Sequence, residues 1–216
     1  MDVGACGVMV APLTGLKTEA QIVTYFADVI AALGEKTPVV YQDYPQSTQA
    51  DISAQSFLKI VDAHPSVVMF KHEDCPGFKK LTQIRKACDG VTRRYICILG
   101  GNGGLYVPQE LARGADGIMT GFAYPEMLVS VSVLFAAGRS DEAVCICRSC
   151  ATSSSRVLGL PCARKFCAGA APFGRRQCAP PGPKLDGLDV AELDRLLSRL
   201  EARLRESANG RRLAVA

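Results

Sequence analysis

The stretch VVMFKHE (residues 67–73) joins four apolar residues, a pattern typical of a buried β-strand, directly to a lysine. Four similar runs rich in Val, Ile and Met occur in the first 121 residues: GVMVA (7–11), PVVYQ (38–42), YICILGG (95–101) and GIMTG (117–121). The five runs begin at residues 7, 38, 67, 95 and 117, so they are 31, 29, 28 and 22 residues apart. This spacing predicts a repeated unit that contains one strand.

Segments with helical periodicity separate the runs. Apolar residues three or four positions apart mark three helix faces: Ile22, Tyr25, Phe26, Val29 and Ile30; Phe57, Ile60 and Val61; Leu81, Ile84 and Ala87. Buried strands that alternate with helices predict a parallel sheet with right-handed crossovers. Both an open doubly wound sheet and a (β/α)8 barrel fit this pattern.

The composition predicts a soluble protein with a sizeable core. The chain has 216 residues, of which 48% are hydrophobic, and this is enough for one compact domain. The apolar run at 8–13 lacks a basic leader and is far shorter than the ~20 residues of a membrane span. We therefore expect a cytoplasmic protein with no membrane partner.

Lys71 is the principal candidate for chemistry. Both architectures place their sites at the carboxyl ends of the strands, where Gln42, Asp43, Lys71 and the glycines at 100–101 fall. A lysine in such a place either extends into water or lies desolvated in the site. Desolvation disfavours the ammonium form and frees the amine to attack a ketone, which gives a Schiff base.

Three segments together carry a family resemblance: PVVYQDYPQST (38–48), SVVMFKHED (66–74) and ILGGNGGLYVPQELARGADGIMTG (98–121). In this order and spacing they resemble the dihydrodipicolinate synthase and N-acetylneuraminate lyase family of class I aldolases. The resemblance implies strands four to eight of a (β/α)8 TIM barrel. It also implies an imine between Lys71 and pyruvate or another 2-oxo acid, without cofactor or metal, in a lyase, aldolase or dehydratase that forms homo-oligomers.

The resemblance also implies substrate-binding residues in two loops. Gly100, Gly101 and Asn102 match the loop after the seventh strand, where backbone groups approach the keto acid and glycine permits close contact. A plain tight turn is an equal alternative for these glycines. Met119 falls on the eighth strand, where the main-chain carbonyl faces the substrate.

One position departs from the family pattern. The family places a proton-shuttling tyrosine three residues before the proline of the fifth-strand loop, and here Pro45 puts Gln42 in that place. An amide has no acidic proton to pass, so we expect no efficient condensation of pyruvate with aspartate semialdehyde. Tyr44 shares strand parity with Gln42 and is the candidate replacement, unless it is a packing residue.

The three residues after Lys71, at 72–74, are expected to form a solvated loop rather than to act as acids or bases. The first three βα units of a barrel of ~250 residues are not among the five predicted here. In the family those units include the loop that grips the carboxylate of the 2-oxo acid. We therefore interpret residues 1–142 as five units of an N-terminally truncated barrel, inactive or impaired by itself.

Residues 143–180 form a Cys- and Arg-rich segment. Six of the ten cysteines lie here: Cys145, Cys147, Cys150, Cys162, Cys167 and Cys178. Seven Lys or Arg residues and no acidic residue fall at 144–185, but few aromatics accompany them, so we expect no nucleic-acid partner.

One alternative for this segment is a non-enzymatic metal-binding module, although the cysteine spacings are poor for zinc. Another is a shifted reading frame, which the nucleotide sequence would reveal.

Residues 181–216 are predicted to form an amphipathic helix. Asp189 is its expected N-cap, and leucines at helical spacing give it an apolar stripe: Leu193, Leu196, Leu197, Leu200 and Leu204. Such a stripe is typical of core or subunit contacts.

Overall fold

The computed structural model describes residues 4–75, 77–122 and 125–147, and in the C-terminal part 186–188, 190–192, 194–195, 198–199 and 202. The chain divides into two compact units. One comprises residues 1–102 with 106–120, and the other comprises 103–105 with 121–216. The first unit contains the sheet and every candidate site residue.

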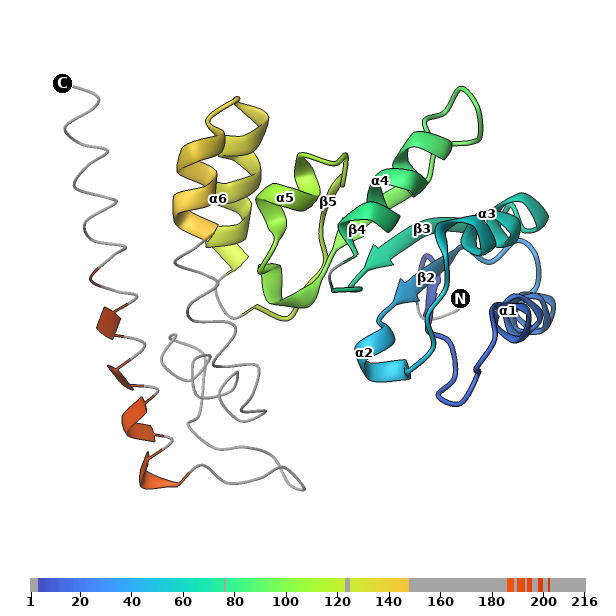
Figure 1. Ribbon diagram of the computed structural model, residues 1–216, viewed down its shortest axis with the longest axis horizontal. Helices are drawn as coiled ribbons and strands as arrows, with labels where there is room; N and C mark the ends of the chain where they lie inside the picture. The colour runs from blue at the N-terminus through green and yellow to red at the C-terminus, as the bar shows by residue number, and fades with distance from the viewer. Residues whose placement is uncertain are drawn as a thin grey trace. The chain divides into compact units, whose positions relative to one another are not determined.

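All five predicted strands form, and they make one parallel sheet (Figure 1). The strands are β1 (Val8–Val10), β2 (Val39–Asp43), β3 (Val67–His72), β4 (Cys97–Gly100) and β5 (Gly117–Ile118). Their spatial order follows the chain, β1-β2-β3-β4-β5. A doubly wound sheet would reverse its order at a switch point, so the sequential order selects the barrel alternative.

The helices of this unit follow the same order. They are α1 (Glu19–Leu33), α2 (Pro45–Thr48), α3 (Ala54–Ala63), α4 (Phe78–Ala87) and α5 (Val107–Leu111), with a 3-10 turn, η1, at Asn102–Gly104. Neighbouring helices contact one another in chain order: α1 contacts α3, α3 contacts α4, and α4 contacts α5. Helices that succeed one another beside successive strands form an outer layer, so the unit is a partial (β/α)8 barrel.

The core lies between the sheet and this helix layer. The predicted helix faces supply buried residues: Ile22, Phe26, Ile30, Phe57, Ile60, Val61, Leu81 and Ile84. At its centre, Phe26, Tyr41, Phe57 and Phe70 form an aromatic stack. The Tyr41 ring lies 4.4 Å from Phe26 and 5.7 Å from Phe70, both nearly parallel to it, and Phe57 contacts Tyr41 and Phe70 at steeper angles.

Strand alternation gives the sheet two different faces. Tyr41 and Phe70 point into the core beneath the helices. Their neighbours Gln42 and Lys71 therefore lie on the opposite face, where they pair in register with each other, and Lys71 pairs in turn with Leu99. In a barrel this second face is the interior.

The second unit contains α6 (Pro125–Ala136), which is followed by helical residues at 140–147. Ala143 and Cys147 are buried, and the Cys147 thiol donates to the Gly104 carbonyl over 3.4 Å. The first residues of the Cys- and Arg-rich segment are thus helical and packed. Its remainder, from residue 148 to 180, lies outside the described residues.

The C-terminal helix begins earlier than predicted. Leu188 N donates to Asp186 Oδ1 over 2.8 Å, and Val190 N donates to the Asp186 carbonyl over 3.1 Å. Asp186 therefore occupies the N-cap position that we expected for Asp189, because both of its acceptor groups face the first turn. The five leucines of the predicted stripe lie outside the described residues.

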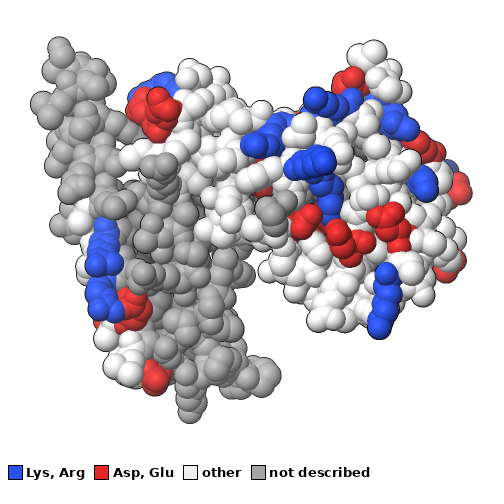
Figure 2. Space-filling model, viewed as in Figure 1, with Lys and Arg blue, Asp and Glu red and all other residues white. Residues whose placement is uncertain are grey.

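Charged side chains of both signs are interspersed over the sheet unit on the face seen in Figure 2. The basic residues counted at 144–185 all lie outside the described part of the chain. No described helix has the length and apolar character that a membrane span requires.

Candidate active site

Lys71 occupies the next-to-last position of β3, and its side chain is held within the protein rather than extended into water. The residue is 8% exposed. Its neighbours across the sheet on the same face are Gln42 of β2 and Leu99 of β4. Of the two predicted alternatives for Lys71, the buried position agrees with a desolvated amine and not with a side chain extended into water.

Glu73 contacts this amine, contrary to the expected solvated loop. It is 8% exposed, and its Oε2 lies 3.2 Å from Lys71 Nζ and accepts a hydrogen bond from Gln42 Nε2 at 2.8 Å. The reason is that Glu73 N donates to the Asp43 carbonyl, so the ladder continues one residue beyond β3. Residues two apart on a strand share a face, and Glu73 therefore points to the side of Lys71.

The glycine loop after β4 completes this group of residues. Gly101 N donates to the His72 carbonyl at 2.9 Å, and Asn102 Nδ2 donates to the Glu73 carbonyl at 2.8 Å. A Cβ built on Gly101 would lie 2.7 Å from Glu73 Cδ and closer still to Cγ. The close approach that glycine permits here is thus to Glu73. Met119, one residue after β5, donates its N–H to the Gly100 carbonyl at 2.8 Å.

Tyr44 follows strand β2 but is not part of it. Strand β2 ends at Asp43, and Tyr44 is the N-cap of α2, so strand parity does not place its side chain. Its carbonyl accepts from Ser47 N and Thr48 N, each at 3.0 Å. Within the described residues, no hydrogen bond joins its hydroxyl to Lys71 or Gln42. The relay role of Tyr44 stays a prediction.

Comparison with solved structures finds a relative that is also similar in sequence. It is the dihydrodipicolinate synthase of Rhodopseudomonas palustris, with 38% identity and a TM-score of 0.85 over 92% of this chain and 67% of that chain. The chain belongs to the dihydrodipicolinate synthase family.

Two further structures, at lower identity, share the fold of this family. One is a prophage protein of the dihydrodipicolinic acid synthase family from E. coli K12, solved in complex with pyruvate (18% identity, TM-score 0.77, 93% of this chain and 68% of that chain). The other is the 4-hydroxy-tetrahydrodipicolinate synthase of Methylacidiphilum fumariolicum SolV (19% identity, TM-score 0.81, 96% and 68%). No protein-family model and no curated protein matches the sequence.

In this dihydrodipicolinate synthase family member, His72 is also buried, on the face of β3 opposite to Lys71. It is 1% exposed, and its Nδ1 lies 2.9 Å from Oε1 of the equally buried Glu110. The Glu110 carboxylate fills the space where a side chain on Gly100 would be, since a Cβ there would lie 2.8 Å from Glu110 Cδ. Both glycines of the loop therefore make room for a buried glutamate.

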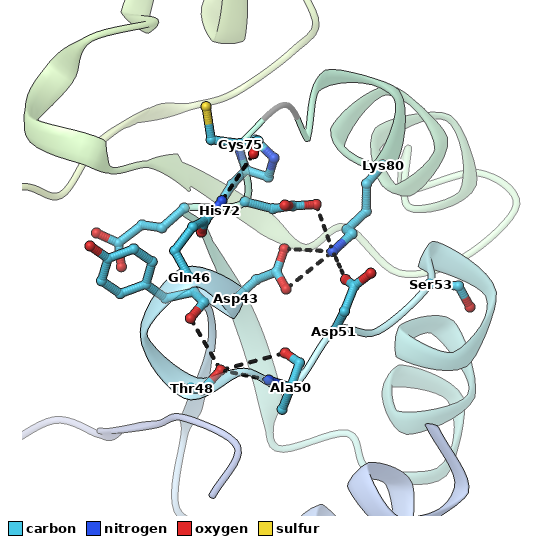
Figure 3. Close-up of polar contacts among 12 residues, drawn as sticks. Asp43, Gln46, Thr48, Ala50, Asp51, Ser53, His72, Cys75 and Lys80 are labelled. Carbon is cyan, nitrogen blue, oxygen red and sulfur yellow. Dashed lines mark hydrogen bonds and ion pairs between the residues drawn. The ribbon is translucent and has the colours of Figure 1, made fainter. Parts of the chain in front are cut away.

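A third charge group, the Lys80 cluster, consists of Lys80, the buried Asp43, the exposed Asp51 and the partly buried Asp74. Figure 3 shows Lys80 between Asp43 and Asp51. The ammonium of Lys80 lies 3.1 Å from Asp43, 2.9 Å from Asp51 and 2.9 Å from Asp74. The cluster ties α4 to the end of β2, to the loop before α3 and to the loop after β3. Lys80 therefore holds the end of β2, next to Lys71, and the loop that directly follows Glu73.

The two central groups of the Lys80 cluster have shifted pKa values. Burial raises the pKa of Asp43 to about 6, although the Lys80 ammonium opposes the rise. Burial by itself would lower the pKa of Lys80, but the surrounding carboxylates of Asp43, Asp51 and Asp74 outweigh it and raise the pKa. The ammonium is thus held in place by charge, at the cost of a desolvated carboxylate.

The structure describes two of the six cysteines of the alternative metal site. Among residues 4–75, 77–122 and 125–147, no group of three or more His, Cys, Asp or Glu side chains is placed to hold a metal ion. Cys145 and Cys147 belong to the helical residues at 140–147, and Cys147 is buried. The other four thiols of the segment lie outside the described residues, so the metal module stays a hypothesis.

We expect Gly101→Ala to destabilise the fold by about 1 to 3 kcal/mol, because the new methyl group overlaps the Glu73 side chain and forces it to move. Urea unfolding measures the change. Gly187→Ala is the control, since no atom lies within 4 Å of that added Cβ, and alanine is favoured over glycine in an exposed helix. Equal effects of the two substitutions would contradict the proposed packing of Glu73.

Proposed function

We propose that this chain is a Schiff-base-forming lyase, aldolase or dehydratase that acts on pyruvate or another 2-oxo acid. The observation that carries the proposal is the buried amine of Lys71, on the interior face of the barrel strands and 3.2 Å from a carboxylate. Membership of the family supports the reaction class. The E. coli relative was solved in complex with pyruvate, which supports a 2-oxo acid as the substrate.

In the proposed reaction, the neutral amine of Lys71 attacks the C2 carbonyl of the 2-oxo acid. The C2–N bond forms as the carbonyl π bond opens, and loss of water gives a protonated imine. The imine withdraws electrons from C3, so that a C3 proton leaves and an enamine forms. The enamine is the species that makes or breaks a carbon–carbon or carbon–oxygen bond.

We assign the remaining residues as follows. Gln42, Gly100, Gly101, Asn102 and Met119 bind the 2-oxo acid through amide and main-chain groups, and Tyr44 moves a proton to or from the second substrate. Gln42 lacks an acidic proton, so the second substrate is not aspartate semialdehyde. The resemblance implies a homo-oligomer for the intact relatives.

Borohydride reduction in the presence of pyruvate tests the proposal. The reagent converts the imine into a stable secondary amine, which peptide mass mapping locates. The expected result is a pyruvate-derived adduct on Lys71, which requires imine formation but no turnover. Absence of an adduct at saturating pyruvate, or an adduct spread over exposed lysines, would overturn the proposed function.

A further inference from the structure

We propose that Glu73 is the general acid and base of imine formation: it takes a proton from Lys71 Nζ and returns it to the hydroxyl that leaves C2 as water. The inference rests on the proposed function of Lys71 and adds a catalytic residue to it. The contact between Glu73 Oε2 and the reacting nitrogen, at 3.2 Å, carries the inference.

The surroundings make Glu73 the group available for this proton. Within the described residues, Lys71 has no ion-pair partner other than Glu73. Asp43 and His72 occupy the other face of their strands, where they pair with Lys80 and Glu110. No hydrogen bond joins the Tyr44 hydroxyl to Lys71 in the described part of the chain. Proton transfer at Nζ requires a group within hydrogen-bond reach, and Glu73 satisfies this condition.

Three residues hold Glu73 in position. Gln42 of β2 donates to Oε2, Asn102 after β4 donates to the Glu73 carbonyl, and Gly101 leaves room for the side chain. The Gln42 amide orients the carboxylate but accepts no proton in exchange. A fixed carboxylate beside a buried amine is preorganised for repeated transfer of one proton.

The proton balance of the step is complete. Glu73 carboxylate takes a proton from the Lys71 ammonium and leaves a neutral amine and a neutral carboxyl. The amine adds to C2 of the 2-oxo acid, and a proton moves from nitrogen to the carbonyl oxygen to give the carbinolamine. The Glu73 carboxyl then protonates this hydroxyl, the C2–O bond breaks, and water leaves. The products are the protonated imine, one water molecule and the original Glu73 carboxylate.

The test is the initial rate of borohydride-trapped adduct formation on Lys71 in the full chain with pyruvate. General acid–base catalysis contributes a factor of 10² to 10⁴, so we expect Glu73→Gln to slow trapping about 100-fold. Glutamine keeps the size of the side chain and an acceptor for Gln42. Glu73→Asp, which keeps the carboxylate, is expected to recover part of the rate. Glu35→Gln, at an exposed site, is the matched control and is expected to trap at the native rate.

A rescue experiment separates catalysis from positioning. In Glu73→Ala, added formate is expected to restore the trapping rate in a saturable manner, because the small carboxylate replaces the missing group beside Nζ. Formate is expected to leave the native protein unaffected. A native trapping rate in Glu73→Gln, or a slow Glu73→Ala that formate does not accelerate, would overturn the role of Glu73 while the adduct on Lys71 upholds the proposed function. A native protein without an adduct on Lys71 would overturn both.

Discussion

Replacing Lys71 with alanine is expected to abolish the pyruvate adduct completely, because the substitution removes the nitrogen that attacks C2. The nearby lysines at 79 and 80 do not compensate. Lys79 is exposed on α4, and Lys80 is enclosed by three carboxylates. Intact mass and peptide mapping after borohydride reduction measure the loss.

Lys79→Ala is the matched control for this experiment, since it removes an exposed amine from the same region of the chain. It is expected to give the native yield of adduct on Lys71. The assignment fails if Lys71→Ala retains an adduct, or if the two variants lose adduct to the same extent.

Replacing Lys80 with methionine is expected to destabilise the fold by about 3 to 5 kcal/mol. The substitution leaves the carboxylate of Asp43, which is 1% exposed, without its counter-charge and removes the links to Asp51 and Asp74. Equilibrium urea unfolding at neutral pH measures the loss. Lys79→Met changes the neighbouring exposed position and is expected to stay within about 0.5 kcal/mol of the native protein.

The pH dependence of stability gives a second measure of the same cluster. The pKa of Asp43 is about 6 in the folded protein, above the ~3.9 of an unperturbed aspartate. Its contribution to stability is therefore fully present below about pH 4 and is lost as the pH rises through about 6. The free energy of unfolding of the native protein, relative to Asp43→Asn, should fall over this interval. A constant difference would contradict the raised pKa.

The strands and the main helix faces were predictable from the sequence because burial imposes simple periods on apolar residues. In the run VVMF (67–70), Val67 and Phe70 are buried, and the residues Phe57, Ile60 and Val61 repeat with the helical period and are all buried. The periodicity by itself left two architectures open, and the family resemblance predicted the barrel. The order of the strands in space confirms the barrel, and that order depends on pairing between distant segments.

The position of Lys71 was also predictable, since a lysine that ends a buried strand lies at the edge where parallel-sheet sites form. The role of its neighbours was not. The polar residues after Lys71 predicted a solvated loop. In the structure, Glu73 N donates to the Asp43 carbonyl, so the pairing of β2 and β3 continues past His72, and both His72 and Glu73 are buried. This extension is a tertiary effect. The paired glycines at 100–101 were the one local signal that bulky groups approach there.

The Lys80 cluster shows a second limit of local patterns. Its three aspartates come from three separate segments, the end of β2 and two loops, and no local sequence pattern connects them. The prediction of Asp189 as the N-cap was wrong for a different reason. Asp186, three residues earlier, is an equally suitable N-cap residue, and the helix begins there.

The aromatic stack in the core allows unfolding to be followed by the ultraviolet absorbance of a buried tyrosine. The chain has six tyrosines and no tryptophan, so its near-ultraviolet spectrum depends on tyrosine and phenylalanine. Burial raises the pKa of Tyr41 far above that of an exposed phenol, and the nearby carboxylates of Asp43 and Asp51 add to the rise. In alkaline solution the Tyr41 phenolate is expected to form only when the fold opens. A late step in phenolate absorbance that is missing in Tyr41→Phe would mark the opening of the barrel wall without any attached label.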